Sequence, residues 1–546
     1  MSIIKQKYKN IIQFTLLFLM FFFSFWHVYC EPGILSVLLC SFVAFIWFLL
    51  AVKKRLLFYF FFFLFFIPCC IHFVYQLVFH QAIDYHSIEQ IFLSNTAIIW
   101  SFLKSHPLFF WCIPAAIIFF ILFLGMVASL MRKHKSSNQT IAVLSAIMFI
   151  LFLIFHVFVL NTTIFQVIWN GYDLWKQDRA FLHDIMKKKI NTSFFNIKNS
   201  EDQTIILVVG DSETKGMMSL YGYEKNTTPF LSERKDSLMI FSDVFSPHAN
   251  TAKVLDKALT LKTFSNETPN NFGSVVDLFS QAGFNVWWLS SPPLRDVWSG
   301  SILAVIASAA EHKFFLNKGA LWDKHDIDLL PQIKKAILHP SSKKLIVIHL
   351  LGSHQPYEDR YSEKDHRSDL TLYENTIYAT DYFMNKVLSF LEKENVKNTK
   401  LLYLSDHGES MKCNCHSDAL GYPEMFEVPF YLWLSPDIRG NFKYDKEILQ
   451  KPYNTENLIH SIADLANVSA DEIDYEKSIF NKNRKAQYII LEGKKYAISS
   501  DLIFDITQPT IRGKVMNFSS DYLKIKWYSS GVTEKWKNTK GLWKKE

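Results

Sequence analysis

The sequence predicts a membrane protein of two parts: an N-terminal bundle of five transmembrane helices, and a C-terminal α/β domain with a largely parallel central sheet. Two observations predict this division. Residues before about 165 are nearly free of charge and rich in the chain's 50 phenylalanines, whereas the remainder has ordinary polar content. After residue 203, short apolar runs alternate with longer amphipathic stretches, which is typical of an α/β fold.

Five stretches in residues 1–165 are apolar and long enough to cross a bilayer, which takes about 20 residues in a helix. Lys and Arg cluster at residues 5–9, 53–55 and 132–135, whereas the opposite loops hold only Lys104. The positive-inside rule therefore places the N-terminus in the cytoplasm and the residues after the fifth span outside it. No small-residue cleavage site follows the first span, so we expect a signal anchor. The predicted spans are residues 11–30, 34–52, 56–79, 108–131 and 141–165.

Residues 166–202 form a predicted linker between the two parts. Aromatic residues such as Trp169 and Trp175 alternate there with charged residues, and three consecutive lysines follow at 187–189. This spacing is typical of an amphipathic helix on a membrane surface. A solvated linker helix explains it equally well.

Within residues 203–546, the short apolar runs are predicted to be buried strands, with helical stretches such as residues 372–395 between them. Sheets of this kind place ligands beyond the carboxyl ends of their strands. Residues 480–546 are predicted to be a strand-rich extension with a Lys- and Trp-bearing tail. A solubilising role is preferred for this tail, and contact with anionic lipid or lipopolysaccharide core phosphates is the alternative. The predicted core strands are residues 204–209, 285–289, 344–350, 400–404 and 428–434.

Polar side chains stand where these strands end. Asp211 follows the first strand, His354 the third, and Asp406 and His407 the fourth. Singly, each has a structural explanation, such as a helix N-cap, but together carboxylate and imidazole groups suit a catalytic zinc ion. Thr251 precedes a helical segment, so its hydroxyl would lie where backbone N–H groups stabilise phosphate oxygens. Coordination to a metal would make that hydroxyl a nucleophile.

The sequence resembles the membrane-bound phosphoethanolamine transferases of Gram-negative envelopes, within the alkaline phosphatase/sulfatase superfamily. The likeness extends from the predicted spans to about residue 440. It implies a sulfatase-like α/β fold for the C-terminal domain, which would lie in the periplasm of a multi-pass protein of the bacterial inner membrane. The resemblance is carried by Gly210-Asp211-Ser212, residues 219–223 and 226–229, His354 in Leu-Gly-Ser-His, Arg360-Tyr361, Tyr373, Asn375, Asp381 and Ser405-Asp406-His407-Gly408-Glu409-Ser410.

The resemblance also implies roles for particular residues. One zinc ion would be held by Asp211, Thr251, Asp406 and His407, and a second zinc ion is left open. Thr251 would accept phosphoethanolamine from phosphatidylethanolamine and pass it to lipopolysaccharide, on core heptose or Kdo or on lipid A. The remaining predicted site residues are His354 and His416, as catalytic and substrate-binding groups of which one acts as general acid or base, and Lys215 as a substrate-binding group.

The chain departs from the family at several positions. The family usually has Glu where this chain has Asp211, which is one methylene shorter, and Glu213 is a fallback ligand that the spacing does not favour. The segment after Thr251 lacks the Pro-Cys pair of many lipid A-modifying members. Residues 290–293 read Ser-Ser-Pro-Pro where the family often has an Asn- or Gln-containing substrate loop.

Cysteine use is a further departure. Of the 7 cysteines, only Cys413 and Cys415 lie outside the predicted membrane region, so the several disulfides of the lipid A-modifying enzymes cannot form. Cys413 and Cys415 flank Asn414 directly before His416. They could close a small ring, add a thiolate near the metal, or do neither. A disulfide is preferred, although so tight a loop is geometrically awkward.

Two other classes of function compete with the transferase hypothesis. A relative in the same superfamily could transfer phosphoglycerol or hydrolyse a phosphate or sulfate ester, although no Cys-x-Pro-x-Arg site stands at the nucleophile position. A non-catalytic envelope scaffold is the third hypothesis, and it is disfavoured because all four zinc positions keep metal-capable groups. The predicted topology excludes nucleic acid as a partner.

Overall fold

The computed structural model describes residues 168–173, 176, 194–262, 273–293, 302–317, 324–418, 420–484 and, with short gaps, 487–546. The five stretches predicted to span a membrane lie outside the described residues. Within the described residues, no helix combines the length and the apolar character needed to cross a membrane. The chain divides into two compact units, residues 1–179 and 180–546. In the first unit, residues 168–173 of the predicted linker are helical.

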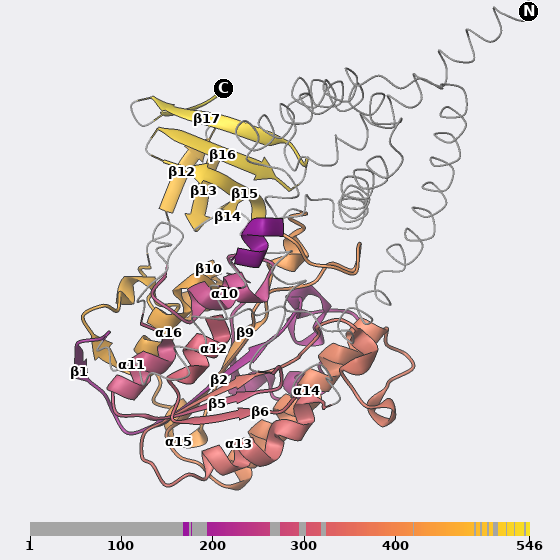
Figure 1. The fold of residues 1–546 in the computed structure, drawn as a ribbon, viewed down its shortest axis with the longest axis vertical. Coiled ribbons are helices and arrows are strands. Elements are labelled where there is room, and N and C mark those ends of the chain that lie inside the picture. Colours follow the sequence, from indigo (N-terminus) through magenta and orange to yellow (C-terminus); the bar gives the residue numbers. More distant parts are fainter. Residues whose placement is uncertain are drawn as a thin grey trace, which may run out of the picture. The chain divides into compact units, whose positions relative to one another are not determined.

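A seven-stranded sheet forms the centre of the second unit (Figure 1). All five predicted core strands are present. Five adjacent strands pair in parallel, and only β9 runs against its neighbours β8 and β3. The prediction of a largely parallel sheet is therefore confirmed, with one reversed strand. In spatial order the strands are β3 (Leu238–Ile240), β9 (Phe430–Leu434), β8 (Thr399–Ser405), β2 (Thr204–Gly210), β7 (Lys344–His349), β5 (Asn285–Ser290) and β6 (His312–Phe315).

The sheet is covered on both faces. Every residue of β2 is buried, because a parallel strand packed between two helical layers needs an apolar side chain at each position. Alternate residues serve opposite faces: Ile205, Leu207 and Val209 belong to one core, whereas Ile206 and Val208 belong to the other. The first core includes α10 (Thr251–Ala258), α11 (Val275–Gln281), α12 (Ile302–Ser308) and α16 (Leu458–Leu465); the second includes α9 (Pro229–Glu233), α13 (Leu330–Ile337) and α14 (Leu372–Lys393).

Helix α14 begins at the predicted residue and ends two residues earlier than predicted. Its start is a capping box: the Thr371 hydroxyl accepts the N–H of Glu374, and the Glu374 carboxylate accepts the N–H of Thr371 at 2.7 Å. Its end is set by Asn395, which has a φ of 50° and turns the chain out of the helix.

Residues 487–546, where the sequence predicts short strands, form a closed seven-stranded barrel (Figure 1). Its interior is filled by side chains such as Ile503, Ile525 and Trp536. Closure leaves no free strand edge to pair with another chain. The strands are β12 (Gln487–Leu491), β13 (Lys494–Ser499), β14 (Leu502–Asp505), β15 (Ile511–Phe518), β16 (Tyr522–Trp527), β17 (Thr533–Thr539) and β18 (Leu542–Lys545).

Two short strand pairs, one short α-helix and several short 3-10 helices complete the described elements around the sheet. They are too short to give a period in the sequence, and the sequence analysis did not predict them. The pairs are β1 (Ile197–Asn199) with β11 (Ser469–Ala470), and β4 (Val244–Phe245) with β10 (Tyr453–Asn454); the helix is α15 (Pro436–Arg439).

Candidate metal centre

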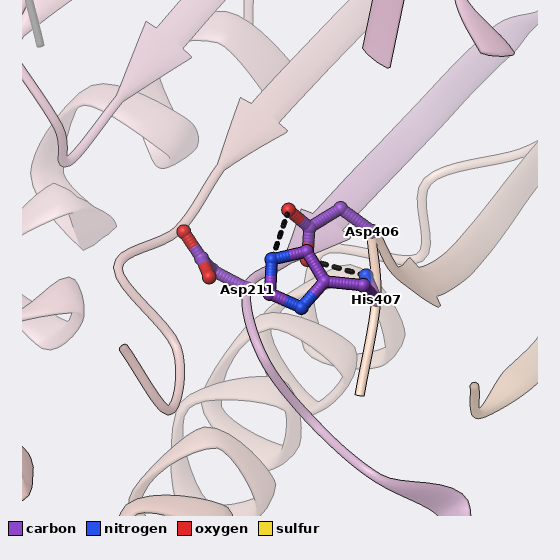
Figure 2. Close-up of side chains that lie close together, drawn as sticks. All are labelled: Asp211, Asp406 and His407. Atoms are coloured by element: carbon purple, nitrogen blue, oxygen red, sulfur yellow. Dashed lines mark hydrogen bonds and ion pairs between the residues drawn. The ribbon is translucent and has the colours of Figure 1, made fainter. Parts of the chain in front are cut away.

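Asp211, Asp406 and His407 meet at the carboxyl ends of two neighbouring strands. Asp211 follows β2 directly, and Asp406 and His407 follow β8, which pairs in parallel with β2. One potential ligand atom from each of the three side chains lies within 4.8 Å of the others, and all three residues are buried (Figure 2). We call these three residues the ligand cluster. The sequence predicted this grouping because parallel strands end at the same edge of a sheet.

Only one of the two oxygens of the Asp406 carboxylate accepts hydrogen bonds from the described residues. Its Oδ1 accepts the backbone N–H groups of Ser212 at 3.1 Å and of His407 at 2.6 Å. Its Oδ2 is buried, has no hydrogen-bond donor among the described residues, and lies 3.5 Å from His407 Nε2. A buried carboxylate oxygen without a donor is costly. The cluster therefore fits a cation, because a metal ion would satisfy this oxygen.

The Asp211 turn is held close to the loop that follows β7. The Asp211 carboxylate accepts the Ser212 hydroxyl at 2.7 Å, and the Asp211 carbonyl accepts the N–H of Ser353 at 2.8 Å. Gly352 packs directly on this turn, so that a Cβ at Gly352 would lie 2.6 Å from the Asp211 nitrogen. The position of Asp211 therefore depends on a residue without a side chain on the neighbouring loop.

His407 presents its Nε2 to the cluster. Its Nδ1 lies 2.9 Å from the carbonyl oxygen of Gly408, which makes Nδ1 the protonated nitrogen and donor. Burial lowers the pKa of His407 below its ordinary value, although Asp406 opposes this. A neutral imidazole whose second nitrogen is fixed by a carbonyl is the usual form of a metal-binding histidine.

Thr251 lies beside the ligand cluster. It is the first residue of α10, and the Asn250 side chain caps the helix by accepting the N–H of Lys253 at 3.2 Å. The buried Thr251 hydroxyl oxygen lies 3.4 Å from His407 Nε2. The structure therefore brings all four predicted zinc-site residues together, from three separate segments of the chain.

His416 lies beside the ligand cluster. The centroid of its ring is 4.2 Å from that of His407, and its Nδ1 is 2.6 Å from Glu409 Oε2. Burial is the largest single influence and opposes the charged imidazolium, but the carboxylates of Glu409, Asp406 and Asp418 together raise the pKa of His416. Glu409 also accepts the Tyr357 hydroxyl at 2.9 Å. This pair can hold a proton next to the metal position.

His354 is buried and differs from His416 in its electrostatic surroundings. Its Nδ1 contacts the carbonyl oxygen of Gln355. Burial is the main cause that holds the pKa of His354 well below its ordinary value, and the Arg360 guanidinium and the nearby His416 lower it further. His354 is therefore kept as a neutral imidazole.

Two candidates lie outside this grouping. Lys215 donates from Nζ to the carbonyl oxygen of Ser242, and its Nζ lies 5.8 Å from the centroid of the Phe245 ring. Its predicted contact with substrate stays a prediction. The fallback ligand Glu213 contacts the Tyr403 hydroxyl instead, and burial raises its pKa to about 7. Asp211 and not Glu213 is thus the carboxylate that the structure brings to Asp406.

The two cysteines near His416 are joined. Cys413 and Cys415 form a disulfide, and Cys415 also bridges to Ser410 through its backbone. This is the preferred one of the three predicted alternatives. It excludes a thiolate ligand from this pair, and it ties the segment between Glu409 and His416 into a small ring.

One partly buried residue near the site was missed by the sequence analysis. Asp418 accepts the N–H of Ala249 at 2.7 Å and contacts His248 Nδ1 at 3.0 Å, Lys253 Nζ at 3.3 Å and Lys514 Nζ at 3.5 Å. Although burial opposes ionisation, Lys514 and His248 hold the pKa of Asp418 well below its ordinary value. No sequence signal identifies Asp418, because its partners come from two segments that are far from it in the chain, residues 248–253 and Lys514.

Comparison with known proteins identifies relatives of this chain. Residues 203–468 match the sulfatase family model. The phosphoethanolamine transferase EptC of Escherichia coli is 27% identical over 326 residues, covering 54% of this chain and 56% of that protein. The phosphoethanolamine transferase CptA of Salmonella typhimurium is 27% identical over 353 residues, covering 58% and 60%. The chain thus spans somewhat more than half the length of these curated relatives.

Solved structures agree with this relationship. The C-terminal periplasmic domain of EptC from Escherichia coli is 26% identical, with a TM-score of 0.50 over 58% of this chain and 97% of that domain. The integral membrane protein EptA from Neisseria meningitidis has a TM-score of 0.58 over 82% of this chain and 91% of EptA, at 18% identity, which supports the fold alone. Residues 203–468 thus belong to an alkaline phosphatase/sulfatase α/β domain, and this part of the chain is similar to the sulfatase domains of phosphoethanolamine transferases.

Proposed function

We propose that this protein transfers phosphoethanolamine from phosphatidylethanolamine to lipopolysaccharide, on core heptose or Kdo or on lipid A. Thr251 would carry the group between the two half-reactions. The observation that carries the proposal is the buried Thr251 hydroxyl, whose oxygen lies 3.4 Å from His407 Nε2 beside the ligand cluster. The names of the curated relatives support the transferred group, and the predicted topology places the domain in the periplasm of an inner-membrane protein.

Zinc is the metal that the residues favour. Asp211, Asp406, His407 and Thr251 would hold the ion, because two carboxylates, a neutral imidazole and a hydroxyl match the hard and borderline ligands that zinc accepts. The periplasmic domain of Escherichia coli EptC has been crystallised in complex with Zn, with 25% identity and a TM-score of 0.50 over 57% of this chain. When bound, zinc would lower the pKa of the hydroxyl and offset charge on the phosphoryl group.

The residues around the cluster provide the proton transfers. In the first half-reaction, the Thr251 oxygen bonds to the donor's phosphorus and the bond from phosphorus to the diacylglycerol oxygen breaks. The proton that the hydroxyl loses is balanced by the proton that the diacylglycerol oxygen gains. His416 is suited to give that proton, because Glu409 raises its pKa. In the second half-reaction, the acceptor oxygen would bond to phosphorus and the bond from phosphorus to the Thr251 oxygen would break. The deprotonated His416 would take the proton of the acceptor hydroxyl, the Thr251 oxygen would regain the proton that it lost in the first half-reaction, and neutral His354 would bind substrate.

The mass of lipopolysaccharide tests the reaction and the acceptor together. Cells with the wild-type chain should gain a phosphoethanolamine increment of about 123 Da on either the lipid A or the core fraction. The Thr251→Ala variant should transfer phosphoethanolamine at least about a thousandfold more slowly, so that the mass increment disappears, because no residue carries the group between the two half-reactions. Thr260→Ala is the matched control, since the Thr260 hydroxyl contacts the Asp256 carbonyl at the end of α10, and it should keep the increment.

The outcomes separate the competing hypotheses. An increment that persists in Thr251→Ala would show that another residue carries the group. An unmodified lipopolysaccharide in wild-type cells would favour phosphoglycerol transfer or ester hydrolysis, which use the same cluster. Zinc analysis is independent of the acceptor: Asp406→Asn and His407→Gln should each lower bound zinc at least about tenfold. If neither substitution lowered the amount of bound zinc, the assignment of Asp406 and His407 as zinc ligands would be wrong.

A further inference from the structure

We propose that one face of the C-terminal barrel docks onto the surface of a bilayer that contains anionic phospholipid. This basic face consists of Tyr522 and Lys524 on β16, Lys535 and Lys537 on β17, and Lys544 on β18. The proposal concerns a surface beyond residues 203–468, the part that matches the sulfatase model. It does not depend on which group the enzyme transfers.

The strand register places these side chains on the same side of the barrel. Lys524 lies opposite Lys535, and Lys537 lies opposite both Tyr522 and Lys544. All four lysines are exposed. The intervening residues point the other way and fill the barrel interior, as Leu523 and Ile525 do on β16 and Trp536 on β17. The period of two along each strand therefore produces a continuous basic surface across three neighbouring strands.

The lysines of the basic face repel one another electrostatically. Like charges directly opposite one another on neighbouring strands destabilise a sheet, and the register creates two such pairs, Lys524 with Lys535 and Lys537 with Lys544. Among the described residues, no carboxylate forms an ion pair with any of these four lysines. Residues 487–546 contain eleven Lys or Arg and six Asp or Glu, a net charge of +5 within the chain's formal +7. An anionic partner would relieve the repulsion.

Apolar groups beside the lysines favour a lipid surface as that partner. Tyr522 is 46% exposed and Lys537 Nζ lies 5.8 Å from the centroid of its ring. Met516, near the end of the neighbouring strand β15, is 47% exposed. Tyrosine with lysine is typical of the membrane–water interface. The chain's predicted spans make a bilayer the extended anionic surface most directly available to it.

The barrel is fixed against the candidate metal centre, so docking would orient that centre. Phe504 on β14 stacks on Phe245, with ring centroids 5.8 Å apart, and Tyr528 stacks on Phe426 at 5.7 Å. Lys514 on β15 reaches Asp418 at 3.5 Å. Asp418 in turn accepts the N–H of Ala249, two residues before Thr251. The basic face is therefore carried by a barrel whose contacts reach the loop of the proposed nucleophile.

Lysine footprinting on the full chain tests the proposal without an activity assay. The chain would be reconstituted in phosphatidylcholine vesicles with or without phosphatidylglycerol, and an amine-reactive reagent would be followed residue by residue by mass spectrometry. With phosphatidylglycerol, the four lysines of the basic face should react about fivefold more slowly, which is the factor expected for a lysine attracted to anionic lipid. High salt should remove the protection, because these charges are exposed to screening.

Two exposed lysines provide the internal control. Lys335 on α13 and Lys397 after α14 lie in the same unit, and Figure 1 shows α13 at the opposite end of the unit from the barrel. Both should react equally with and without phosphatidylglycerol. In the triple variant Lys524→Gln/Lys535→Gln/Lys537→Gln, protection of Lys544 should disappear. A Lys335→Gln/Lys397→Gln variant should keep the protection.

Several results would contradict the proposal. Equal reactivity of the basic face in both vesicle types would exclude docking on anionic phospholipid. Equal protection of Lys335 and Lys397 would show general crowding at the vesicle surface. Protection by a soluble oligonucleotide in detergent, but not by phosphatidylglycerol, would identify a different class of partner. Since none of these outcomes involves phosphoethanolamine transfer, failure of the docking proposal leaves the proposed reaction untouched.

Discussion

Gly352 packs directly on the backbone of Asp211. Gly352 has a φ of 50°, a conformation that other residues adopt only with strain, and an added Cβ would lie 2.6 Å from the nitrogen and 2.7 Å from the oxygen of Asp211. These contacts are with backbone atoms, which cannot move aside as a flexible side chain would. A residue outside the ligand cluster therefore fixes one of its members.

Gly352→Ala should displace Asp211 and reduce zinc binding. The left-handed conformation and the contact with the Asp211 backbone should together cost about 1–3 kcal/mol of unfolding free energy. Zinc per chain after dialysis and the thermal midpoint would be measured for both proteins. Gly216→Ala is the matched control, since an added Cβ there meets nothing within 4 Å. Unchanged zinc in Gly352→Ala would show that the Asp211 turn adapts.

His460 gives a pH dependence that is separate from the metal centre. It lies on α16, its Nδ1 accepts the N–H of Asp474 at 3.2 Å, and burial lowers its pKa from 6.5 to about 4. Between these values the unfolded chain binds more protons than the folded chain. Stability from this residue is therefore complete above pH 6.5 and falls as the pH drops to about 4.

The His460→Asn substitution should make the free energy of unfolding depend less on pH between pH 6.5 and about 4. Asparagine keeps an acceptor for the Asp474 N–H but does not titrate, so about 3 kcal/mol of the loss between pH 6.5 and 4 should disappear. Denaturant titrations of the full chain in detergent at several pH values would measure it. His349, whose pKa burial also lowers to about 4, should contribute to the pH dependence that remains in this variant. The exposed His366→Asn is the control, and an equal change in both variants would contradict the assignment.

Between elements, Asp418 connects the segment before α10 to the barrel. It contacts His248 and Ala249 next to the helix start, Lys253 in the first turn of α10, and Lys514 on β15. The apolar packing around this region includes Phe245, Phe426 and Leu502 from the same parts of the chain. The barrel is thus a structural support of the loop that carries Thr251.

Asp418→Asn should destabilise the protein and slow transfer. The Asp418 side chain is only 15% exposed and faces several cationic groups, so loss of its charge should cost about 3 kcal/mol, the low end for a buried ion pair. The N–H of Ala249 would keep only a neutral amide oxygen as its acceptor. Asp369→Asn is the matched control, because Asp369 pairs with Arg367 on the surface and is 63% exposed. Thermal midpoints and turnover would be compared. Transfer by Asp418→Asn at the wild-type rate, with normal zinc content, would contradict a positioning role.

For the whole molecule, the central expectation is that the catalytic unit lies outside the cytoplasm. An alkaline phosphatase reporter fused after Ser200 should be active, because that enzyme matures only outside the cytoplasm and the positive-inside rule places this point there. A fusion after Lys54, between the second and third predicted spans, should be inactive. Reporter activity in the opposite pattern would overturn the predicted topology, while leaving the fold of residues 203–468 unaffected.

The sheet and its ligand cluster could be predicted from the sequence because both depend on local patterns. Apolar runs such as 204–209 must be buried strands, and parallel strands bring the residues that follow them to the same edge of the sheet. This is why Asp211, Asp406 and His407 were expected together before any coordinates were known. Thr251 could be added only because a helix start and a family motif coincide at that residue.

Other features depended on long-range packing, which leaves no local pattern. Asp418 gathers partners from residues 248–253 and from Lys514, about 100 or more residues away in each direction. Glu213 is followed closely in sequence by Lys215, yet the turn after β2 directs Glu213 to Tyr403 and Lys215 to Ser242. Side-chain direction in such a turn follows from the backbone around it and from its neighbours in space. The lysines between residues 524 and 544 are scattered in the sequence, and only the strand register shows that they lie on one face of the barrel. The pairing of neighbouring strands determines which of these lysines lie opposite one another.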